Sequence, residues 1–398
     1  MISWWLREAE PLASLSELRG PLRADVCIVG GGFTGLWTAL EIKRQEPSLD
    51  VVLVAADVCG SGASGRNGGF AMTFWHHFTG LERACGAEQA LWLARASEAA
   101  VAEIGEFCSQ NEIQAHYRRA GWLWTATNQA QVGAWESTVA AIERRGEKPF
   151  ERLDADEVAA GTGSRTHLAG VFEPGSATVQ RALLARGLLR SPGDQLERMG
   201  WGKGVSISDS RLMVHYYRTT EDGRIAFGKG GGRLAYGPRI GSSFTGRSPI
   251  ADEVARGLRA TYPALSAVPI TASWTGPIDR TVDGLPFFYS PGRPNLVCGA
   301  GDSGNGAGPS LIGGRILASM ALGRDDDWAR SRACANAPAG DARGAVPIRR
   351  RPDRARRSGA EGARRGRGPV SGIDRSGAGG IGAGGTGAAR LIPAARRH

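Results

Sequence analysis

Several features that would assign the chain to other classes of protein are missing. None of its apolar runs approaches the ~18 residues of a membrane span, and residues 1–8 hold only a short apolar run broken by charges, unlike a signal peptide. The six cysteines have no C-x-x-C or zinc spacing, and Cys27 lies in an apolar run that predicts a buried strand. We therefore expect a cytoplasmic protein without a membrane anchor, disulfides or a metal site.

Acidic residues are scarce only in the last part of the chain. The formal net charge is +10, yet residues 331–398 hold 15 Arg, no Lys and four acidic residues, so the first 330 residues carry a net charge of −1. This tail has no Phe, Trp or Tyr, and Ala, Gly and Arg supply 44 of its 68 residues. Because such a segment buries too little apolar area to offset its ordering entropy, we expect it to be disordered.

Two interpretations of this tail follow from its composition. As an Arg-rich interaction segment it would bind a polyanion, although proteins that bind single strands interleave aromatic residues with the charges. Alternatively, Ala, Gly and Arg all have GC-rich codons, and their excess indicates a shifted reading frame, which we favour. The folded body is close to neutral, so we do not expect it to bind nucleic acid.

The stretch Val26–Gly35 organises the rest of the chain. Its four leading apolar residues predict a strand buried on both faces, and the residues after the glycines have helical spacing. Gly30, Gly32 and Gly35 fill the pattern G-x-G-x-x-G, which serves a tight turn, the approach of a pyrophosphate and close helix packing. A second apolar run, Val51–Ala55, closes a βαβ unit, so we expect a dinucleotide with its pyrophosphate at the helix N-terminus.

The second strand lacks the acidic residue that normally holds the adenosine ribose. The strand ends at Ala55, and Asp57, two residues on, is the candidate substitute. A second loop of small residues, 60–69, follows this strand, and a nicotinamide-binding unit does not need such a loop. We therefore expect a cofactor larger than NAD.

These motifs together resemble a known family. G-x-G-x-x-G followed by A-S-G-R-N-G-G resembles the FAD-dependent amine and amino-acid oxidases of the D-amino-acid oxidase family, which includes glycine oxidase. Residues 274–286 resemble the W-x-G-x-x-D-R-T-x-D-G-L-P segment of members similar to gamma-glutamylputrescine oxidase. Residues 295–310 resemble the final strand, glycine turn and helix that close over the flavin. The resemblance covers residues 20 to about 330.

The resemblance implies an α/β (α+β) fold, in which a Rossmann-like FAD-binding parallel sheet is joined to an antiparallel-sheet substrate domain. It implies noncovalently bound FAD and a small amine or amino-acid substrate. In the reaction of the family, a hydride passes from the carbon bearing the amine to flavin N5, the imine is hydrolysed, and dioxygen usually reoxidises the flavin.

The resemblance also implies the residues of the site. The expected positions are Gly30, Gly32, Phe33, Thr34 and Gly35 at the pyrophosphate, Ser64, Arg66, Asn67, Gly68 and Gly69 near the ribitol and flavin, and Gly301, Gly304, Asn305 and Gly306 at the flavin edge. Asp302 stands where an aromatic residue is usual, and a carboxylate beside an anionic reduced flavin is unfavourable. The candidates for substrate contact are Tyr216, Tyr217, Lys229 and Arg280, residue types that are also common on sheets and surfaces.

Periodicity predicts the remaining elements. We expect helices at residues 87–111, 129–145, 155–161, 178–190 and 252–262, with Asp154 starting the third, and strands at residues 121–126, 212–218, 224–228, 270–276 and 295–297. The link 219–223 indicates a hairpin. His76 and His77 are adjacent and have no third ligand nearby, so we expect them to be structural.

One part of the expected parallel sheet is missing. The helix ending at Arg190 should lead into further strands, but residues 191–204 contain no apolar run of strand length. Either this segment has diverged, or two strands of the sheet are deleted, which we favour. We expect an FAD-binding domain from residues 1–86, 164–190 and 290–330, and a substrate domain from residues 87–163 and 200–289. The alternative to an active oxidase is a catalytically impaired remnant of one.

Overall fold

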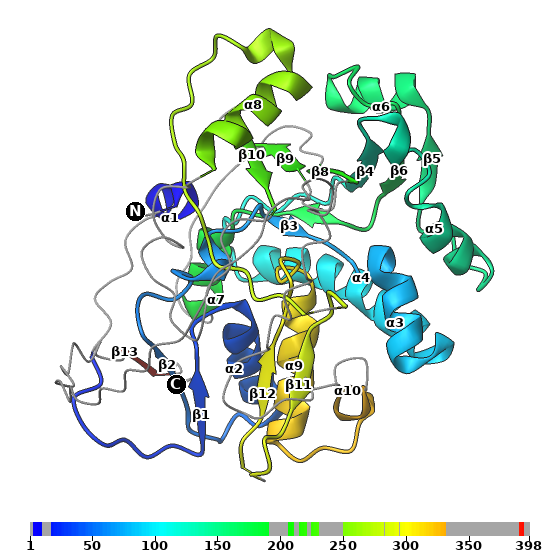
Figure 1. Cartoon of the computed structure of the whole chain (residues 1–398). Helices are drawn as coiled ribbons and strands as arrows, with labels where there is room; N and C mark the ends of the chain where they lie inside the picture. The colour runs from blue at the N-terminus through cyan, green and yellow to red at the C-terminus, as the bar shows by residue number, and fades with distance from the viewer. Residues whose placement is uncertain are drawn as a thin grey trace, which may run out of the picture.

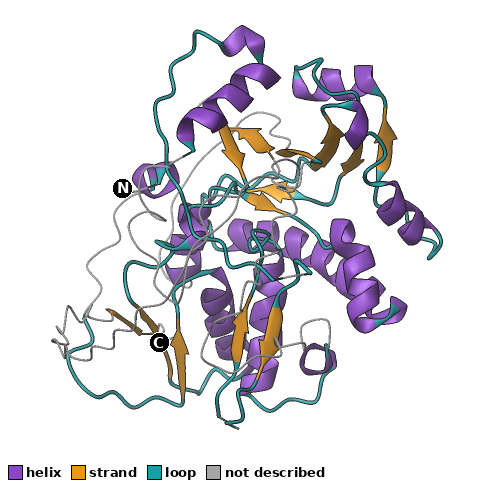
Figure 2. Cartoon of the chain, viewed as in Figure 1, coloured by secondary structure: helices purple, strands orange, loops and turns teal. Residues whose placement is uncertain are grey.

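The computed structural model describes residues 3–9, 17–190, 206–210, 215–220, 224–230, 250–281, 283–293, 295–331 and 390–393. Two helices, α2 (Phe33–Gln45) and α9 (Pro309–Ala321), pack against each other in the lower part of the molecule in Figure 1. Short strands lie on one side of this pair, and a larger sheet lies above it, as the orange arrows of Figure 2 show. The chain therefore combines a layer of helices and short strands, as in nucleotide-binding folds, with a separate larger sheet. This agrees with the predicted fold class.

The predicted βαβ unit is confirmed. Strands β1 (Val26–Val29) and β2 (Val51–Ala55) pair in parallel, with α2 between them in the chain. Strand β2 is largely buried, as a run of Val and Leu predicts. On its outer edge lies β13 (Arg390–Pro393), which pairs antiparallel with it, so the order of this sheet is β1-β2-β13.

The prediction that β1 is buried on both faces is wrong. Cys27 is exposed and Val29 is 85% exposed, because these alternate residues share one face of β1 and no described residue covers that face. The predicted final strand begins at Cys298 instead of Asn295: it is β12 (Cys298–Ala300), which pairs antiparallel with β11 (Phe287–Tyr289). Thus β1 and β12 belong to separate sheets, and the described part of the parallel sheet contains only β1 and β2 as parallel partners.

The larger sheet has six strands in the order β10-β9-β8-β4-β6-β5. All neighbours pair antiparallel except β4 and β8, which are parallel, so the predicted antiparallel sheet holds with one exception. The strands are β4 (Trp122–Ala126), β5 (Glu151–Leu153), β6 (Ala169–Glu173), β8 (Ser206–Asp209), β9 (His215–Thr219) and β10 (Ile225–Lys229). The predicted hairpin is confirmed by the pairing of β9 with β10; its tip, residues 221–223, and residues 211–214 lie outside the described residues.

The other elements surround these sheets. The helices are α1 (Trp4–Glu8), α3 (Phe78–Cys85), α4 (Ala87–Gln110), α5 (Glu136–Glu143), α6 (Ala155–Thr162), α7 (Arg181–Arg190), α8 (Ala251–Thr261) and α10 (Asp327–Arg330). Short 3-10 turns occur at Ala63–Gly65, Trp75–His77, Gln129–Gln131 and Pro263–Leu265. Strands β3 (Phe70–Ala71) and β7 (Ala177–Thr178) form an antiparallel pair.

Capping and turn residues determine where these helices begin. Asp154 caps α6 with a complete capping box, as expected from its position. The predicted helix 129–145 is wrong in its first half, because Gly133 has a φ of +80° and separates a 3-10 turn from α5. Helix α7 begins only at Arg181, because the side-chain oxygen of Gln180 accepts hydrogen bonds from the N–H groups of Ala182 and Leu183.

The predicted strand 270–276 is absent: the structure describes these residues, and none is in a strand. The segment instead follows the second glycine loop. The Trp274 indole N–H donates to the carbonyl oxygen of Arg66 at 3.0 Å, and the Thr275 carbonyl accepts from the Arg66 guanidinium at 3.4 Å. Hydrogen bonds with that loop therefore take the place of the backbone hydrogen bonds between strands that the β-rich composition predicted.

Helices α2 and α9 touch almost backbone to backbone. A Cβ added at Gly314 of α9 would lie 2.6 Å from the Cβ of Trp37 and 2.9 Å from its carbonyl carbon. Around this crossing, Phe33, Leu36 and Leu311 are at most 3% exposed and belong to the main core. A glycine at position 314 is thus required by the approach of the two helices.

We predict that Gly314→Ala destabilises the protein by about 1–3 kcal/mol, because the added methyl group has no space between the helices. The matched control is Gly161→Ala in α6, where an added Cβ meets only Leu123 at 3.7 Å, an ordinary contact distance. There the gain in helix propensity is expected to leave stability unchanged or slightly higher. Urea unfolding of both variants checks this, and equal stabilities would contradict the proposed crossing.

The tail falls mostly outside the described residues. Residues 332–389 and 394–398 are not described, so the predicted disorder is untested there, whereas residues 390–393 form β13. We predict that ending the chain after Ser331 changes the melting temperature by less than about 2 °C, since a few edge hydrogen bonds are offset by the entropy of ordering that strand. Calorimetry of the shortened and full chains tests this. A fall of several degrees would assign β13 a stabilising role.

Candidate functional site

A cavity of about 2050 Å³ opens between the start of α2, the second glycine loop, β10, α8 and residues 268–280. Small-molecule sites usually measure roughly 300–1000 Å³. The cavity is larger here because it continues along β1, so that Val26–Val29 and residues 296–299 both line it. The open edge of β1 and the candidate site are therefore one continuous space.

The first glycine turn forms one wall. The Gly30 N–H donates to the Val54 carbonyl at 2.8 Å, which joins the turn to β2. Gly32 is the N-cap of α2 and has no side chain to occupy the helix end. A Cβ at Gly35 would overlap the Gly30 carbonyl oxygen, so this turn requires glycine there. The predicted pyrophosphate residues all line the cavity: Gly30, Gly32, Phe33, Thr34 and Gly35.

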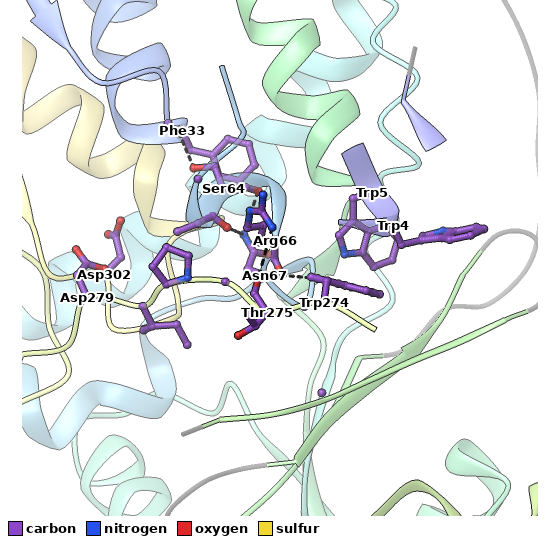
Figure 3. Close-up of a pocket in the computed structure, with 18 of the residues that line it drawn as sticks. Trp4, Trp5, Phe33, Ser64, Arg66, Asn67, Trp274, Thr275, Asp279 and Asp302 are labelled. Atoms are coloured by element: carbon purple, nitrogen blue, oxygen red, sulfur yellow. Dashed lines mark hydrogen bonds between the residues drawn. The ribbon is translucent and has the colours of Figure 1, made fainter. Parts of the chain in front are cut away.

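The second loop is bonded directly to the first. The Ser64 hydroxyl accepts a hydrogen bond from the Phe33 N–H at 3.0 Å (Figure 3). The Asn67 amide folds the loop on itself, since it donates to the carbonyls of Ala63 and Ser64 and accepts from the Gly69 N–H. Of the predicted residues of this loop, Ser64, Arg66, Asn67 and Gly68 line the cavity, and Gly69 lies behind it. Such a wall of backbone and small side chains leaves room for a flat ligand.

Arg66 connects this loop to the segment after α8. Its Nε donates to the Ser61 carbonyl at 2.8 Å, and its terminal nitrogen reaches the Thr275 carbonyl. Burial lowers the pKa of Arg66, and the charge of Asp57 opposes that shift. Asp57 itself is exposed, accepts from the N–H of Val58 and is not part of the cavity wall. The expected ribose ligand is therefore not at the cavity.

The third glycine turn precedes α9, and two carboxylates lie at it: Asp302 of the turn and Asp279 of the segment 268–280. The Gly301 N–H donates to Asp279 Oδ2 at 2.6 Å, and Asp302 lies beside Asp279 in the cavity (Figure 3). Burial, and secondly the charge of Asp279, raise the pKa of Asp302 to about 7. Near neutral pH the Asp302 carboxyl is therefore partly protonated, which lessens the negative charge at this end of the cavity.

The four residues predicted at the flavin edge do not line this cavity themselves. Gly301, Gly304, Asn305 and Gly306 form the turn behind Asp302. The side-chain amide nitrogen and oxygen of Asn305 are buried and have no hydrogen-bond partner among the described residues. Unpaired buried polar atoms are unfavourable, so this turn is suited to bind a further polar group.

Three of the four substrate candidates reach the cavity. Tyr216, Lys229 and Arg280 line it, and Lys229 forms an ion pair with Glu253 at 3.0 Å. Tyr217 points to the opposite face of β9, because neighbouring strand residues alternate. There its hydroxyl lies 2.9 Å from the His167 Nε2. Tyr217 therefore belongs to the sheet core.

Sequence reasoning did not single out the tryptophans of this cavity. Trp4, Trp5 and Trp274 all line it, and Trp5 meets Trp274 edge to face at 6.0 Å (Figure 3). The adjacent pair Trp4-Trp5 near the start of the chain was the available signal, because two neighbouring tryptophans in a short amphipathic segment need an apolar surface to cover.

Other site types receive no support from the described residues. His76 and His77 are half-buried with their rings 4.1 Å apart, and loss of solvent lowers the pKa of both, that of His77 to about 4. Within the described ranges, no group of three or more His, Cys, Asp or Glu is placed to hold a metal ion. Nor does any helix in those ranges have the length and apolar character needed to cross a membrane.

Comparison with known proteins finds relatives of similar sequence and solved structures of similar fold. Gamma-glutamylputrescine oxidoreductase of Escherichia coli is 28% identical over 412 aligned positions, which cover 84% of this chain and 92% of that protein. Among solved structures, glycine oxidase from Geobacillus kaustophilus has a TM-score of 0.57 at 17% identity, over 77% of this chain and 96% of that one. An iminodiacetate oxidase from a Chelativorans species has a TM-score of 0.57 at 18% identity, over 76% and 96%.

A family model also matches the chain. The model of the FAD dependent oxidoreductase family, DAO, matches residues 25–200 and 191–320, which is well over half of the chain and includes all three glycine turns. The predicted FAD cofactor and the predicted family are thereby confirmed. The chain belongs to the DAO family of FAD-dependent oxidoreductases, enzymes that oxidise amines or amino acids.

Proposed function

We propose that this chain oxidises the C–N bond of a small amine or amino acid that enters the cavity beside the second glycine loop. The observation that supports this is the convergence of two glycine turns and the Asp302 segment on one cavity. FAD, when bound, supplies the hydride acceptor, and hydrolysis of the imine and reoxidation by dioxygen complete the reaction. The free cysteines suit a cytoplasmic location, where thiols stay reduced.

The residues present fit FAD better at its pyrophosphate than at its adenosine ribose. The N-terminus of α2 is open toward the cavity, and its N–H groups and positive dipole end suit a pyrophosphate. We assign Ser64, Arg66 and Gly68 to the ribitol and flavin, and the turn at Asn305 to the flavin edge. At the ribose, Ala55 offers no carboxylate, and we expect weaker binding there.

We also propose the two domains that the sequence predicts. Residues 1–86, 164–190 and 290–330 would bind FAD, and residues 87–163 and 200–289 would bind the substrate. Tyr216, Lys229 and Arg280 are the substrate candidates that line the cavity. Asp279 and Asp302 give the opposite end a partly negative charge, which suits the ammonium group of an amine.

A second candidate is a catalytically impaired remnant, and the open edge of β1 favours it. The alignment with the E. coli relative spans 412 positions, more than the 398 residues of this chain, so it requires gaps here. The family match also divides into two segments that meet at residues 191–200, where the sequence predicts a deletion. We expect a lower affinity for the cofactor, because the described residues form only two parallel strands of the sheet that carries the first turn.

The first test concerns the cofactor. We predict that Gly32→Val abolishes FAD retention, because the side chain would enter the space that the pyrophosphate needs. An added Cβ at this position lies 3.1 Å from Ser64 Oγ, closer than an ordinary contact, so the hydroxyl that accepts from the Phe33 N–H has to shift by a few tenths of an ångström. The flavin absorbance of the purified protein, with release of FAD on denaturation, is the measurement. Equal FAD content in variant and parent would refute this placement, and melting of the FAD-free proteins controls for folding.

The second test separates the two candidate functions. We predict that inserting after Arg190 the segment of the E. coli relative that faces the gap raises FAD occupancy, melting temperature and turnover together. A strand paired with β1 would bind the N–H and C=O groups of its open edge and give Cys27 and Val29 cross-strand neighbours on their face of the sheet. A Gly-Ser linker of the same length is the control.

Turnover is measured with a panel of amines and of D- and L-amino acids. If the chain without the insert already holds one FAD per protein and turns over as fast as the restored one, the argument from the missing strand fails. If only the restored chain is active, the present chain is the impaired remnant.

A further inference from the structure

The edge of β1 that points away from β2 has free backbone groups. The N–H groups of Val26 and Gly30 form hydrogen bonds on the β2 side, at 3.1 and 2.8 Å. Because the backbone groups of successive residues alternate between the two edges of a strand, the N–H and C=O groups of Cys27 and Val29 point to the other edge. Among the described strands, none pairs with β1 at that edge. Such an edge is a template for a further strand.

The part of the cavity beside this edge is an apolar trough. Strand β1 forms one side of it, and residues 296–299, which lead into and include most of β12, form the other (Figure 1). Helices α2 and α9, which pack against each other, contribute Ile42, Leu317 and Ala321 to its floor. None of the described residues that line this part of the cavity carries a charge. The trough therefore combines apolar walls with one row of free backbone donors and acceptors.

The two faces of the trough differ in exposure. Ile28 faces α2, since a Cβ added at Gly35 would lie 3.4 Å from its Cγ2. Its neighbours Cys27 and Val29 face the opposite way, and Val29 is 85% exposed. A chain lying in the trough thus needs apolar side chains toward the helices and accepts polar ones on the other face. An apolar residue at every second position is the pattern of a half-buried strand.

We propose that the trough between β1 and β12 binds an extended segment of a partner protein as a further strand, with apolar residues at every second position. Backbone hydrogen bonds would supply affinity, and side chains packed on Ile42 and Leu317 would supply specificity. An apolar small molecule would leave the backbone groups of Cys27 and Val29 unpaired. A second copy of this chain has no free strand to offer among its described residues, because each of its strands already pairs within a sheet.

The first measurement uses a fluorescein-labelled peptide, Lys-Val-Thr-Ile-Thr-Val-Lys, and the full-length protein free of FAD. Fluorescence anisotropy is expected to show saturable binding. An analogue with N-methyl groups at both Thr and at Ile keeps every side chain but loses donors toward both sides of the trough. We expect it to bind about tenfold more weakly or worse. Equal affinities would show apolar adsorption without strand pairing, and no binding of either peptide would also overturn the proposal.

Amide hydrogen exchange resolved to single residues locates the bound peptide. The N–H groups of Cys27 and Val29 are expected to exchange more slowly when the peptide is present. Those of Val26 and Gly30 serve as internal controls, because they are already bonded on the β2 side. If the peptide binds and the exchange of Cys27 and Val29 does not change, it lies elsewhere and the proposal fails.

A pair of variants tests β1 itself. Cys27→Pro removes a donor that points into the trough and none that bonds to β2, so it is expected to weaken peptide binding about tenfold. Cys27→Ala alters the same side chain, keeps the N–H group and should bind as the parent does. Equal affinities of the two folded variants would contradict pairing with β1. If Cys27→Pro does not fold, the N-methylated peptide and the exchange measurement decide on the unaltered protein.

The inference does not rest on the proposed function, because every measurement is made without FAD. Sedimentation of the protein alone covers the remaining occupant. A dimer that the peptide dissociates would assign the trough to a second copy of this chain and overturn its assignment to a partner protein. A monomer that binds the peptide with the expected exchange pattern supports it.

Discussion

The contact between α2 and α9 holds the candidate site together. Each helix begins just after a glycine turn, α2 after Gly32 and α9 after the turn that contains Asn305. Since β1 and β12 belong to separate sheets, no shared ladder among the described residues fixes these turns relative to each other. Packing around Gly314 does so instead, with help from Arg315, whose Nε lies 3.2 Å from Glu41 of α2. The site therefore depends on helix packing where a parallel sheet would normally carry it.

Sequence patterns predicted the parts of the fold that depend on neighbouring residues. The βαβ unit, the capped start of α6 and the hairpin of β9 and β10 each arise from a few adjacent side chains, and all three are present. The patterns gave wrong predictions where contacts with residues distant in the sequence determine the structure. Residues 270–276 have strand composition, yet they bond to Arg66 in place of a strand, and Cys27 is exposed because no described residue covers its face of β1. The positions of Tyr216 and Tyr217 relative to the cavity likewise required the register of β9.

An intact motif and a complete site are different properties of this chain. The glycine turns persist because each is set by its own hydrogen bonds, such as that of Gly30 to Val54 and that of Phe33 to Ser64. We expect cofactor retention to depend in addition on the strand order around β1, which no local motif records. A motif search therefore gives the family of this protein with certainty but leaves its catalytic competence to the sheet. An oxidase and an impaired remnant would therefore share every glycine.

The net charge of the whole chain and the charge at the candidate site are likewise separate properties. The net charge of +10 comes from the tail, and the first 330 residues carry −1, so the overall balance says nothing about the cavity. What a ligand meets is set by a few charged groups that line the cavity: Arg66 beside Gly68, and Asp279 and Asp302 beside Gly301. Charges in the cavity act on a ligand over short distances, whereas charges farther away through solvent are screened within about 10 Å. The selectivity of the cavity is thus determined by residues that contribute almost nothing to the net charge.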